Sequence, residues 1–258
     1  MTTKDQKLQA FSRLLDIMDE LREQCPWDKK QTFESLRHLT IEETYELGDA
    51  ILDNNLVEIK KELGDLLLHI VFYSKIGSET NNFDITDVCN SISDKLIYRH
   101  PHIYSDTKVE NEEDVKRNWE QLKLKEGNGR ESVLEGVPKS LPAMVKASRM
   151  QEKVAAVGFE WENSKQFLAK IQEEIEEFSI EQKKKDQDKM EAEFGDILFA
   201  LINYARFNNI NPENALERTN KKFISRFKNV EQQAKKNGFK IADLPLKELL
   251  SYWEKAKG

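Results

Sequence analysis

Apolar residues recur every three to four positions along most of this chain, with charged and polar residues between them. That spacing places the apolar side chains on one face of a helix, which is typical of amphipathic α-helices. Long runs of strict apolar–polar alternation, the pattern of a half-buried strand, do not occur. The pattern therefore predicts an all-α protein, with helices near 5–23, 34–53, 55–77, 84–99, 111–126, 143–156, 212–236 and 246–257.

Two further helical segments carry acidic side chains at helical spacing, with an apolar stripe beside each acidic one. Each acidic stripe begins with a lysine and continues with two acids, and together they comprise Lys170, Glu174, Glu177, Lys189, Glu193 and Asp196. We expect these two helices to fold back antiparallel around the polar run 181–188, with their apolar faces inward. The four carboxylates would then meet at the edge of a core.

Carboxylates brought this close repel one another unless a cation neutralises them. Oxygen ligands suit a hard ion, and Mg²⁺ commonly takes substrate phosphates as further ligands. The pattern thus predicts Mg²⁺ at the four acids, with Mn²⁺ as an alternative, and phosphate oxygens at the two lysines. One copy of this pattern alone would rather indicate two acidic surface helices with i,i+4 ion pairs.

The same acidic pattern occurs a second time, 131 residues earlier, where Glu42 corresponds to Glu173. Both copies read Glu-Glu-x-x-Glu, then fifteen residues, then Glu-x-x-Asp. The earlier copy therefore adds four candidate metal ligands, which are Glu43, Glu46, Glu62 and Asp65. Flanking residues repeat as well, since Trp27 and Trp119 match Trp161 and Trp253.

A repeat that covers most of the chain indicates two tandem domains rather than a solenoid of short units. We place the N-terminal domain at 1–128 and the C-terminal domain at 143–258. Glycines and prolines interrupt the helical pattern at 129–142, so this segment is the expected linker.

The acidic pattern and its flanks resemble the MazG family of nucleoside triphosphate pyrophosphohydrolases. The resemblance also rests on the segments CPWDKKQTF, ISDKLIYRHPH and VGFEW. It covers nearly the whole chain, which is similar to the two-domain bacterial members of the family. It implies tandem helical bundles of the four-helix type, each completed by homodimerisation. It also implies Mg²⁺-dependent hydrolysis of an NTP or dNTP, ATP included, to the monophosphate and pyrophosphate. By this resemblance, Lys170, Lys189, Lys222, Arg226 and Trp253 match nucleotide-contacting positions.

The two copies differ beside their acids. Where the second copy has Lys170, Lys189 and Asn203, the first has Leu39, Glu58 and Phe72. A triphosphate is strongly anionic, so the loss of two cations and the gain of an anion should weaken its binding. We therefore expect the C-terminal copy to be the catalyst, with Asn203 among its substrate contacts. The N-terminal copy is expected to be weak or inactive, with a regulatory or structural role.

Two side chains have more than one interpretation. Glu173 faces somewhat away from the other acids, so it is a candidate for orienting or deprotonating the attacking water. Its alternative role is an ion pair with a lysine. Trp253 could stack on a base, because every base has a π face, or it could anchor the C-terminal helix to its core.

Composition and charge exclude several other classes. The net charge of −7 argues against a nucleic-acid-binding protein. No apolar run is long enough to span a membrane. Two distant cysteines make neither a disulfide framework nor a zinc site, so we expect reduced thiols and a cytoplasmic protein. A di-iron bundle would need Glu-x-x-His motifs, whereas both copies have Glu-x-x-Asp, so a di-iron site is disfavoured. The remaining alternatives are a non-catalytic nucleotide sensor and a helical interaction module.

Overall fold

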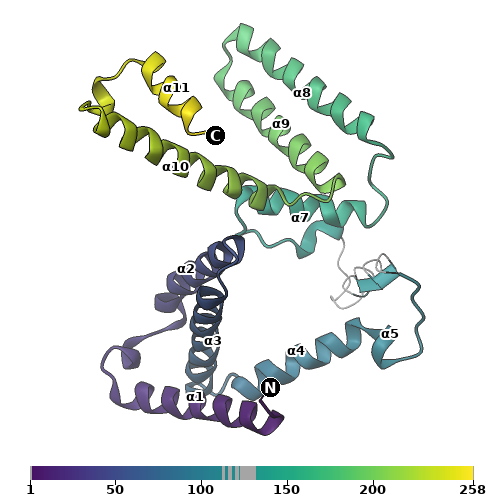
Figure 1. The fold of residues 1–258 in the computed structure, drawn as a ribbon. Helices are drawn as coiled ribbons and strands as arrows, with labels where there is room; N and C mark the ends of the chain where they lie inside the picture. Colours follow the sequence, from purple (N-terminus) through teal and green to yellow (C-terminus); the bar gives the residue numbers. More distant parts are fainter. Residues whose placement is uncertain (1, 112–113, 116–117, 120–121, 123–131, 258) are drawn as a thin grey trace. The chain divides into compact units, whose positions relative to one another are not determined.

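A computed structural model describes residues 2–111, 114–115, 118–119, 122 and 132–257. Over these residues it contains ten α-helices and no strand, which confirms the predicted all-α class (Figure 1). The predicted helix at 111–126 and the first residues of the predicted linker lie mostly outside the described residues. Among the described helices, none combines the length and the apolar character needed to cross a bilayer.

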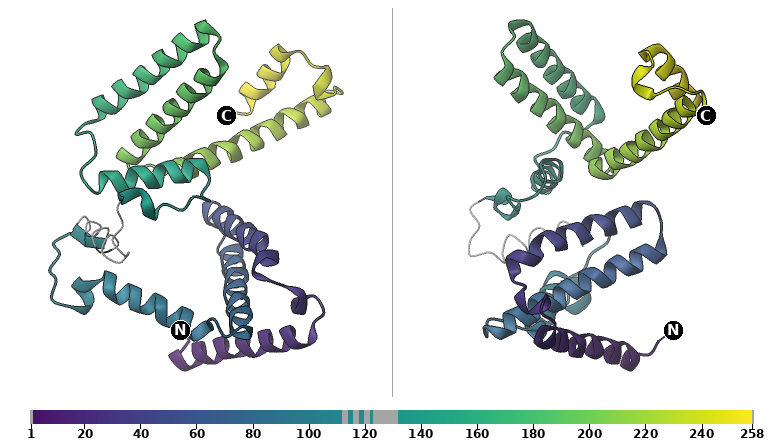
Figure 2. Two further views of the ribbon diagram at one scale, coloured as in Figure 1. Left: turned by 180° about the vertical axis from the view of Figure 1, so that it is seen from behind. Right: turned by 90° about the vertical axis from the view of Figure 1, so that its left-hand side faces the viewer.

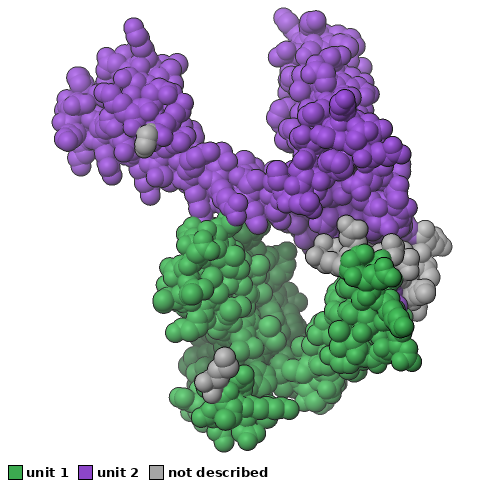
Figure 3. Space-filling model, turned by 45° about the vertical axis from the view of Figure 1, so that its right-hand side comes forward, with its two compact units in different colours: residues 1–119 green, residues 120–258 purple. Residues whose placement is uncertain are grey.

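The chain divides into two compact units, which are Met1–Trp119 and Glu120–Gly258 (Figure 3). The helices of unit 1 are α1 (Lys4–Gln24), α2 (Phe33–Leu52), α3 (Leu56–Glu79), α4 (Ile85–Arg99) and α5 (Pro101–Tyr104). Those of unit 2 are α7 (Ala143–Ala155), α8 (Ser164–Lys184), α9 (Gln187–Phe207), α10 (Pro212–Lys236) and α11 (Leu246–Lys255). The domain boundaries inferred from the sequence stay a prediction.

Capping residues determine where the acid-bearing helices begin. The side chain of Thr32 accepts a hydrogen bond from the backbone N–H of Ser35 at the start of α2, and Ser35 returns the bond. Asn163 and Gln166 form the same reciprocal pair at the start of α8. Each pair satisfies backbone N–H groups that the first helical turn leaves without a partner.

The connection between α8 and α9 is shorter than the predicted polar run 181–188. Helix α8 continues to Lys184, and only Lys185 and Asp186 separate it from α9. Lys185 adopts a left-handed conformation with φ of 59°, which ends α8, and the side chain of Asp186 caps the start of α9. An ion pair of 2.7 Å between Lys184 and Glu181 extends the helix, since a cation is favoured in a last turn.

A buried apolar cluster holds α1, α2 and α3 of unit 1 together. Its members are each at most 7% exposed, and they are Met18, Leu36, Val71, Phe72 and Ile76. Arg22 of α1 lies over the ring of Phe72, 5.7 Å from its centroid, and bonds Glu79 at 2.7 Å. Burying each large apolar side chain contributes about 1.5–3 kcal/mol, so this cluster positions α2 against α3.

In unit 2, α8 and α9 pack as an antiparallel hairpin, and α10 pairs with α11 (Figures 1 and 2). Phe167 of α8 is 1% exposed, and its ring contacts Phe207 of α9 at 4.4 Å between centroids. The prediction that both apolar stripes face inward is only partly right. Phe194 is 52% exposed and Leu168 is 49% exposed, because a two-helix hairpin covers only part of each stripe.

The packing around Gly77 of α3 yields a test of this fold. A Cβ atom at Gly77 would lie 2.8 Å from the backbone oxygen of Phe83, so Gly77→Ala should lower the free energy of unfolding by about 1–3 kcal/mol. Gly48 of α2 is the matched control, because nothing lies within 4 Å of the equivalent Cβ. Gly48→Ala should raise that free energy by about 0.5–1 kcal/mol. Denaturant unfolding followed by circular dichroism measures both, and equal effects would contradict this packing.

Candidate metal and nucleotide site

Three of the four acids predicted to bind metal in the C-terminal copy meet between α8 and α9. Glu174, Glu177 and Glu193 each bring a carboxylate oxygen within 4.8 Å of the others. Glu174 and Glu177 lie one turn apart on α8, and Glu193 reaches them from α9. Asp196, one turn further along α9, is exposed and is not a member of this group.

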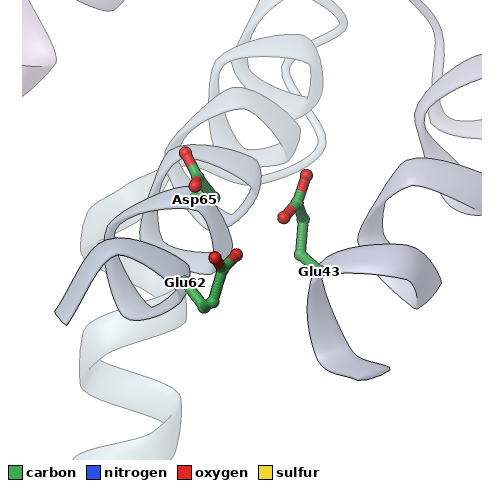
Figure 4. Close-up of side chains that lie close together, drawn as sticks. All are labelled: Glu43, Glu62 and Asp65. Atoms are coloured by element: carbon green, nitrogen blue, oxygen red, sulfur yellow. The ribbon is translucent and has the colours of Figure 1, made fainter. Parts of the chain in front are cut away.

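The N-terminal copy forms a corresponding group from α2 and α3. Glu43 of α2 points toward Glu62 and Asp65 of α3, again with one oxygen of each within 4.8 Å of the others (Figure 4). Glu46 is exposed and is not a member. Glu43 and Glu62 therefore converge in this copy as Glu174 and Glu193 do in the other.

A lysine neutralises the most buried acid of the C-terminal group. The Lys170 ammonium lies 2.7 Å from Glu174 and 2.9 Å from Glu173, and these two contacts raise the pKa of Lys170. Glu174 is only 6% exposed, so this ion pair offsets part of the cost of burying its charge. Glu173 thus forms the ion pair that was one of its two predicted interpretations. Whether it also acts on water stays a prediction.

The remaining acids are not fully neutralised. Burial, followed by the charges of Glu174 and Glu193, raises the pKa of Glu177 above its ordinary value. Burial and the charge of Asp65 likewise raise the pKa of Glu43. Both shifts mean that the ionised carboxylates are held where negative charge is unfavourable.

Glu62 gives an independent indication that the groups fit a cation. It is 2% exposed, and its Oε1 atom lies 3.0 Å from the ammonium of Lys61. Its Oε2 atom is buried and has no hydrogen-bond partner within the described parts of the chain. A buried carboxylate oxygen is stable only with a partner. An oxygen-only donor set with a spare buried oxygen fits a hard divalent ion.

Three of the other predicted nucleotide contacts are paired with residues outside the acidic group. Lys189 forms an ion pair of 3.7 Å with Asp186, its N-terminal helix cap. Arg226 of α10 lies 5.9 Å from the ring centroid of Trp253, and that ring contacts Phe223 at 5.0 Å. Trp253 therefore packs α11 onto α10, as its structural interpretation predicted. Lys222 is exposed on the same helix α10.

A pocket of about 350 Å³ lies next to Asn203, between α7 and α9. Its lining includes Gln151, Trp161 and Phe199. The Oδ1 atom of Asn203 accepts a hydrogen bond of 3.0 Å from Arg206. Gln151, on the predicted helix 143–156, is not among the predicted site residues, because its burial does not follow from the helical pattern.

Comparison with known proteins bears on this geometry directly. The family described as "MazG nucleotide pyrophosphohydrolase domain" matches residues 31–104 and again 162–231. The chain belongs to the MazG family. The two MazG matches confirm the tandem duplication, and they contain all eight acids predicted as metal ligands together with Lys222 and Arg226, whereas Trp253 lies beyond them.

Curated relatives extend the MazG likeness over nearly the whole chain. It is 40% identical over 257 residues to a protein of Escherichia coli K12 named nucleoside triphosphate pyrophosphohydrolase, covering 97% of this chain and 98% of that one. A Thermotoga maritima protein named nucleoside triphosphate pyrophosphohydrolase/pyrophosphatase MazG is 41% identical, with 96% of each chain covered. Bacillus subtilis YabN is 46% identical, and 98% of this chain matches 53% of YabN.

The raised pKa of Glu177 predicts how this MazG site affects stability. The folded state holds the Glu177 proton more tightly than the unfolded chain does. Stability should therefore fall as the pH rises from the ordinary glutamate pKa through the raised one, and stay lower above it. Without divalent ions, Glu177→Gln should consequently have a higher Tm than the parent protein at pH 7, and the difference should shrink under acidic conditions.

Glu176→Gln is the matched control, because Glu176 accepts a hydrogen bond from Gln172 and lies outside the acidic group. Its stability should change by no more than about 0.5 kcal/mol at either pH. Differential scanning calorimetry with and without MgCl₂ measures both variants, and the ion should stabilise the parent protein more than Glu177→Gln. A lower Tm for Glu177→Gln in metal-free buffer would contradict the crowding of these acids.

Proposed function

We propose that this chain is an enzyme that hydrolyses nucleoside triphosphates, in ribo or deoxy form, to the monophosphate and pyrophosphate. The observation that carries the proposal is the convergence of carboxylates from two antiparallel helices, with Lys170 bound to the most buried of them. The relatives named nucleoside triphosphate pyrophosphohydrolase support the same activity, and their likeness covers nearly the full length of this chain.

The acids are assigned to the metal and the cations to the phosphates. Mg²⁺, or alternatively Mn²⁺, would be held by Glu174, Glu177 and Glu193, with Asp196 joining from the next turn of α9. When bound, such an ion supplies positive charge against the triphosphate as pyrophosphate leaves. The side chains assigned to the nucleotide are Lys170, Lys189, Asn203, Lys222, Arg226 and Trp253.

Glu173 is assigned to the attacking water. Its side chain is 55% exposed and is held at 2.9 Å by Lys170, so it borders the acidic group without belonging to it. From this place its carboxylate orients a water molecule and accepts a proton from it as the water attacks. Lys170 positions Glu173 for that purpose, because the ion pair holds its carboxylate beside the acidic group.

The C-terminal copy is the catalyst in this proposal. Leu39 stands where the C-terminal copy has Lys170, so the N-terminal acids lack that phosphate contact. Their buried Glu62 is paired instead with Lys61, whose counterpart in the other copy is Ala192. The N-terminal copy is thereby suited to a weak, regulatory or structural role.

A homodimer would complete the helical bundles. Several apolar side chains of α8 and α9 are between 41% and 52% exposed, and they are Leu168, Ile175, Phe194, Leu198 and Leu201. Exposed apolar stripes on a helical hairpin are stabilised when a second hairpin covers them in a four-helix arrangement. We propose that a second copy of this chain does so, in a cytoplasmic enzyme that binds neither nucleic acid nor membrane.

Paired substitutions in the two copies test which one is the catalyst. Glu193→Ala should lower kcat for pyrophosphate release at least 100-fold, on the order of the loss when one electrostatic stabiliser is removed. Glu62→Ala, at the corresponding position of the N-terminal copy, should leave most of the turnover. Steady-state assays with mixed NTPs and dNTPs in MgCl₂ measure both. The reverse ranking would assign catalysis to the N-terminal copy, whereas nucleotide binding without release would favour a sensor.

Substitution of an exposed apolar residue tests the dimer. Phe194→Asp places a charge at a ring that is 52% exposed on α9. A desolvated, unpaired charge is costly, so the variant should sediment as a monomer or bind its partner at least about 100-fold more weakly. Analytical ultracentrifugation measures this, and a monomeric parent protein would refute the dimer.

A further inference from the structure

His69 is a buried histidine on α3 with a ring nitrogen that has no partner among the described residues. The side chain is 6% exposed, and the buried nitrogen is Nδ1. The ring lies 6.4 Å from that of Tyr73, between centroids, but the Tyr73 hydroxyl forms its hydrogen bond of 2.6 Å with Thr40 of α2. A buried polar atom is stable only with a partner, so packing against Tyr73 leaves this nitrogen available for a ligand.

His69 lies on the same stripe of α3 as two acids of the N-terminal group. It follows Asp65 by four residues and Glu62 by seven, and such positions share one face of a helix. Helical side chains lean toward the N-terminus of their helix, so the imidazole extends toward the turn that carries Asp65. Burial lowers the pKa of His69, while the negative charge of Asp65 acts in the opposite direction. At neutral pH the ring is therefore a neutral imidazole near a carboxylate, and the neutral form is the one that binds metal ions.

The acidic group of unit 1 contains a second buried atom without a partner. One carboxylate oxygen each of Glu43, Glu62 and Asp65 lies within 4.8 Å of the others (Figure 4). Two oxygens on opposite sides of one ion are about 4.4 Å apart, so small side-chain adjustments would let all three contact the same ion. Lys61 pairs with Oε1 of Glu62, whereas Oε2 is buried and has no hydrogen-bond partner in the described part of the chain. One face of α3 thus presents two buried atoms that lack partners, an oxygen and a nitrogen.

We propose that unit 1 holds a first-row transition-metal ion, such as Mn²⁺, Co²⁺ or Zn²⁺, with the imidazole of His69 as a ligand beside the acidic group of α2 and α3. Imidazole nitrogen suits these ions, whereas Mg²⁺ prefers oxygen ligands. The ion of unit 1 therefore differs in kind from the Mg²⁺ that the acids alone predict. The inference concerns unit 1 and does not rest on the proposed catalysis in unit 2.

Unit 2 has no equivalent nitrogen ligand. Ala200 stands 131 positions after His69, and all four histidines of the chain lie before residue 120. The acidic side chains of α8 and α9 accordingly offer only oxygens to an ion. Unit 1 also has Glu58 where unit 2 has Lys189, so the charge near its acids repels a triphosphate and attracts a cation. These differences suit a resident ion that joins α2 to α3 rather than an ion that arrives with a substrate.

Electron spin-echo envelope modulation with Mn²⁺ tests for the nitrogen ligand, because this measurement detects the ¹⁴N nucleus of a coordinated imidazole. The full-length protein is loaded with one equivalent of Mn²⁺ in excess MgCl₂, so that Mg²⁺ fills sites made only of oxygens. The parent protein should show the ¹⁴N modulation, and His69→Gln should lose it. His102→Gln is the matched control and should keep the modulation, since the Nδ1 atom of His102 is also buried without a partner among the described residues.

Isothermal titration with Zn²⁺ in the same buffer measures the affinity of the site. His69→Gln should bind Zn²⁺ at least about 10-fold more weakly than the parent protein, the smallest loss typical when even a supporting partner of a metal ligand is removed. Glu43→Gln on α2 leaves His69 in place and should weaken Zn²⁺ binding by a similar factor, because nitrogen and acids hold one ion. A parent protein without the ¹⁴N modulation, its loss in His102→Gln instead, or an unchanged Zn²⁺ affinity of Glu43→Gln would overturn the site.

Discussion

Carboxylates from two neighbouring helices share one small volume in each half of this protein, and the rest of the structure accommodates that crowding. Glu62 and Glu174 are nearly inaccessible to solvent, and each is paired with a lysine. The lysines come from different positions, Lys61 on α3 and Lys170 on α8. A fold that places acids so close loses stability without a cation, so the arrangement is understandable as a site for ligands rather than as packing.

The two copies use a common hairpin in different ways. In unit 1, Phe72 is buried in the apolar cluster that joins α1, α2 and α3. In unit 2, the corresponding Asn203 borders a pocket between α7 and α9. A closed core stabilises, whereas an open pocket with a buried unsatisfied amide costs stability. The copy that has Lys170 beside its acids is thus also the copy with a pocket between α7 and α9.

Much of this architecture follows from interactions between residues that are close in the sequence. Helical periodicity depends only on residues three and four apart, and caps such as Thr32 and Asn163 act within one turn. The all-α class, most helix ends and the duplication were predictable for that reason. So was the pairing of α8 with α9, because two amphipathic helices joined by a short polar connection have few other ways to bury their apolar stripes.

The sequence by itself determined which residue types are available for the site, but only the tertiary structure decided which of them meet. Eight acids share the same spacing, yet Asp65 joins its group while Asp196 does not, and Glu177 joins while Glu46 does not. The burial of Gln151 likewise follows only from the packing of α7 on α9. The physical reason is that such contacts depend on how helices cross and on side-chain rotamers, and neither follows from residue spacing along one helix.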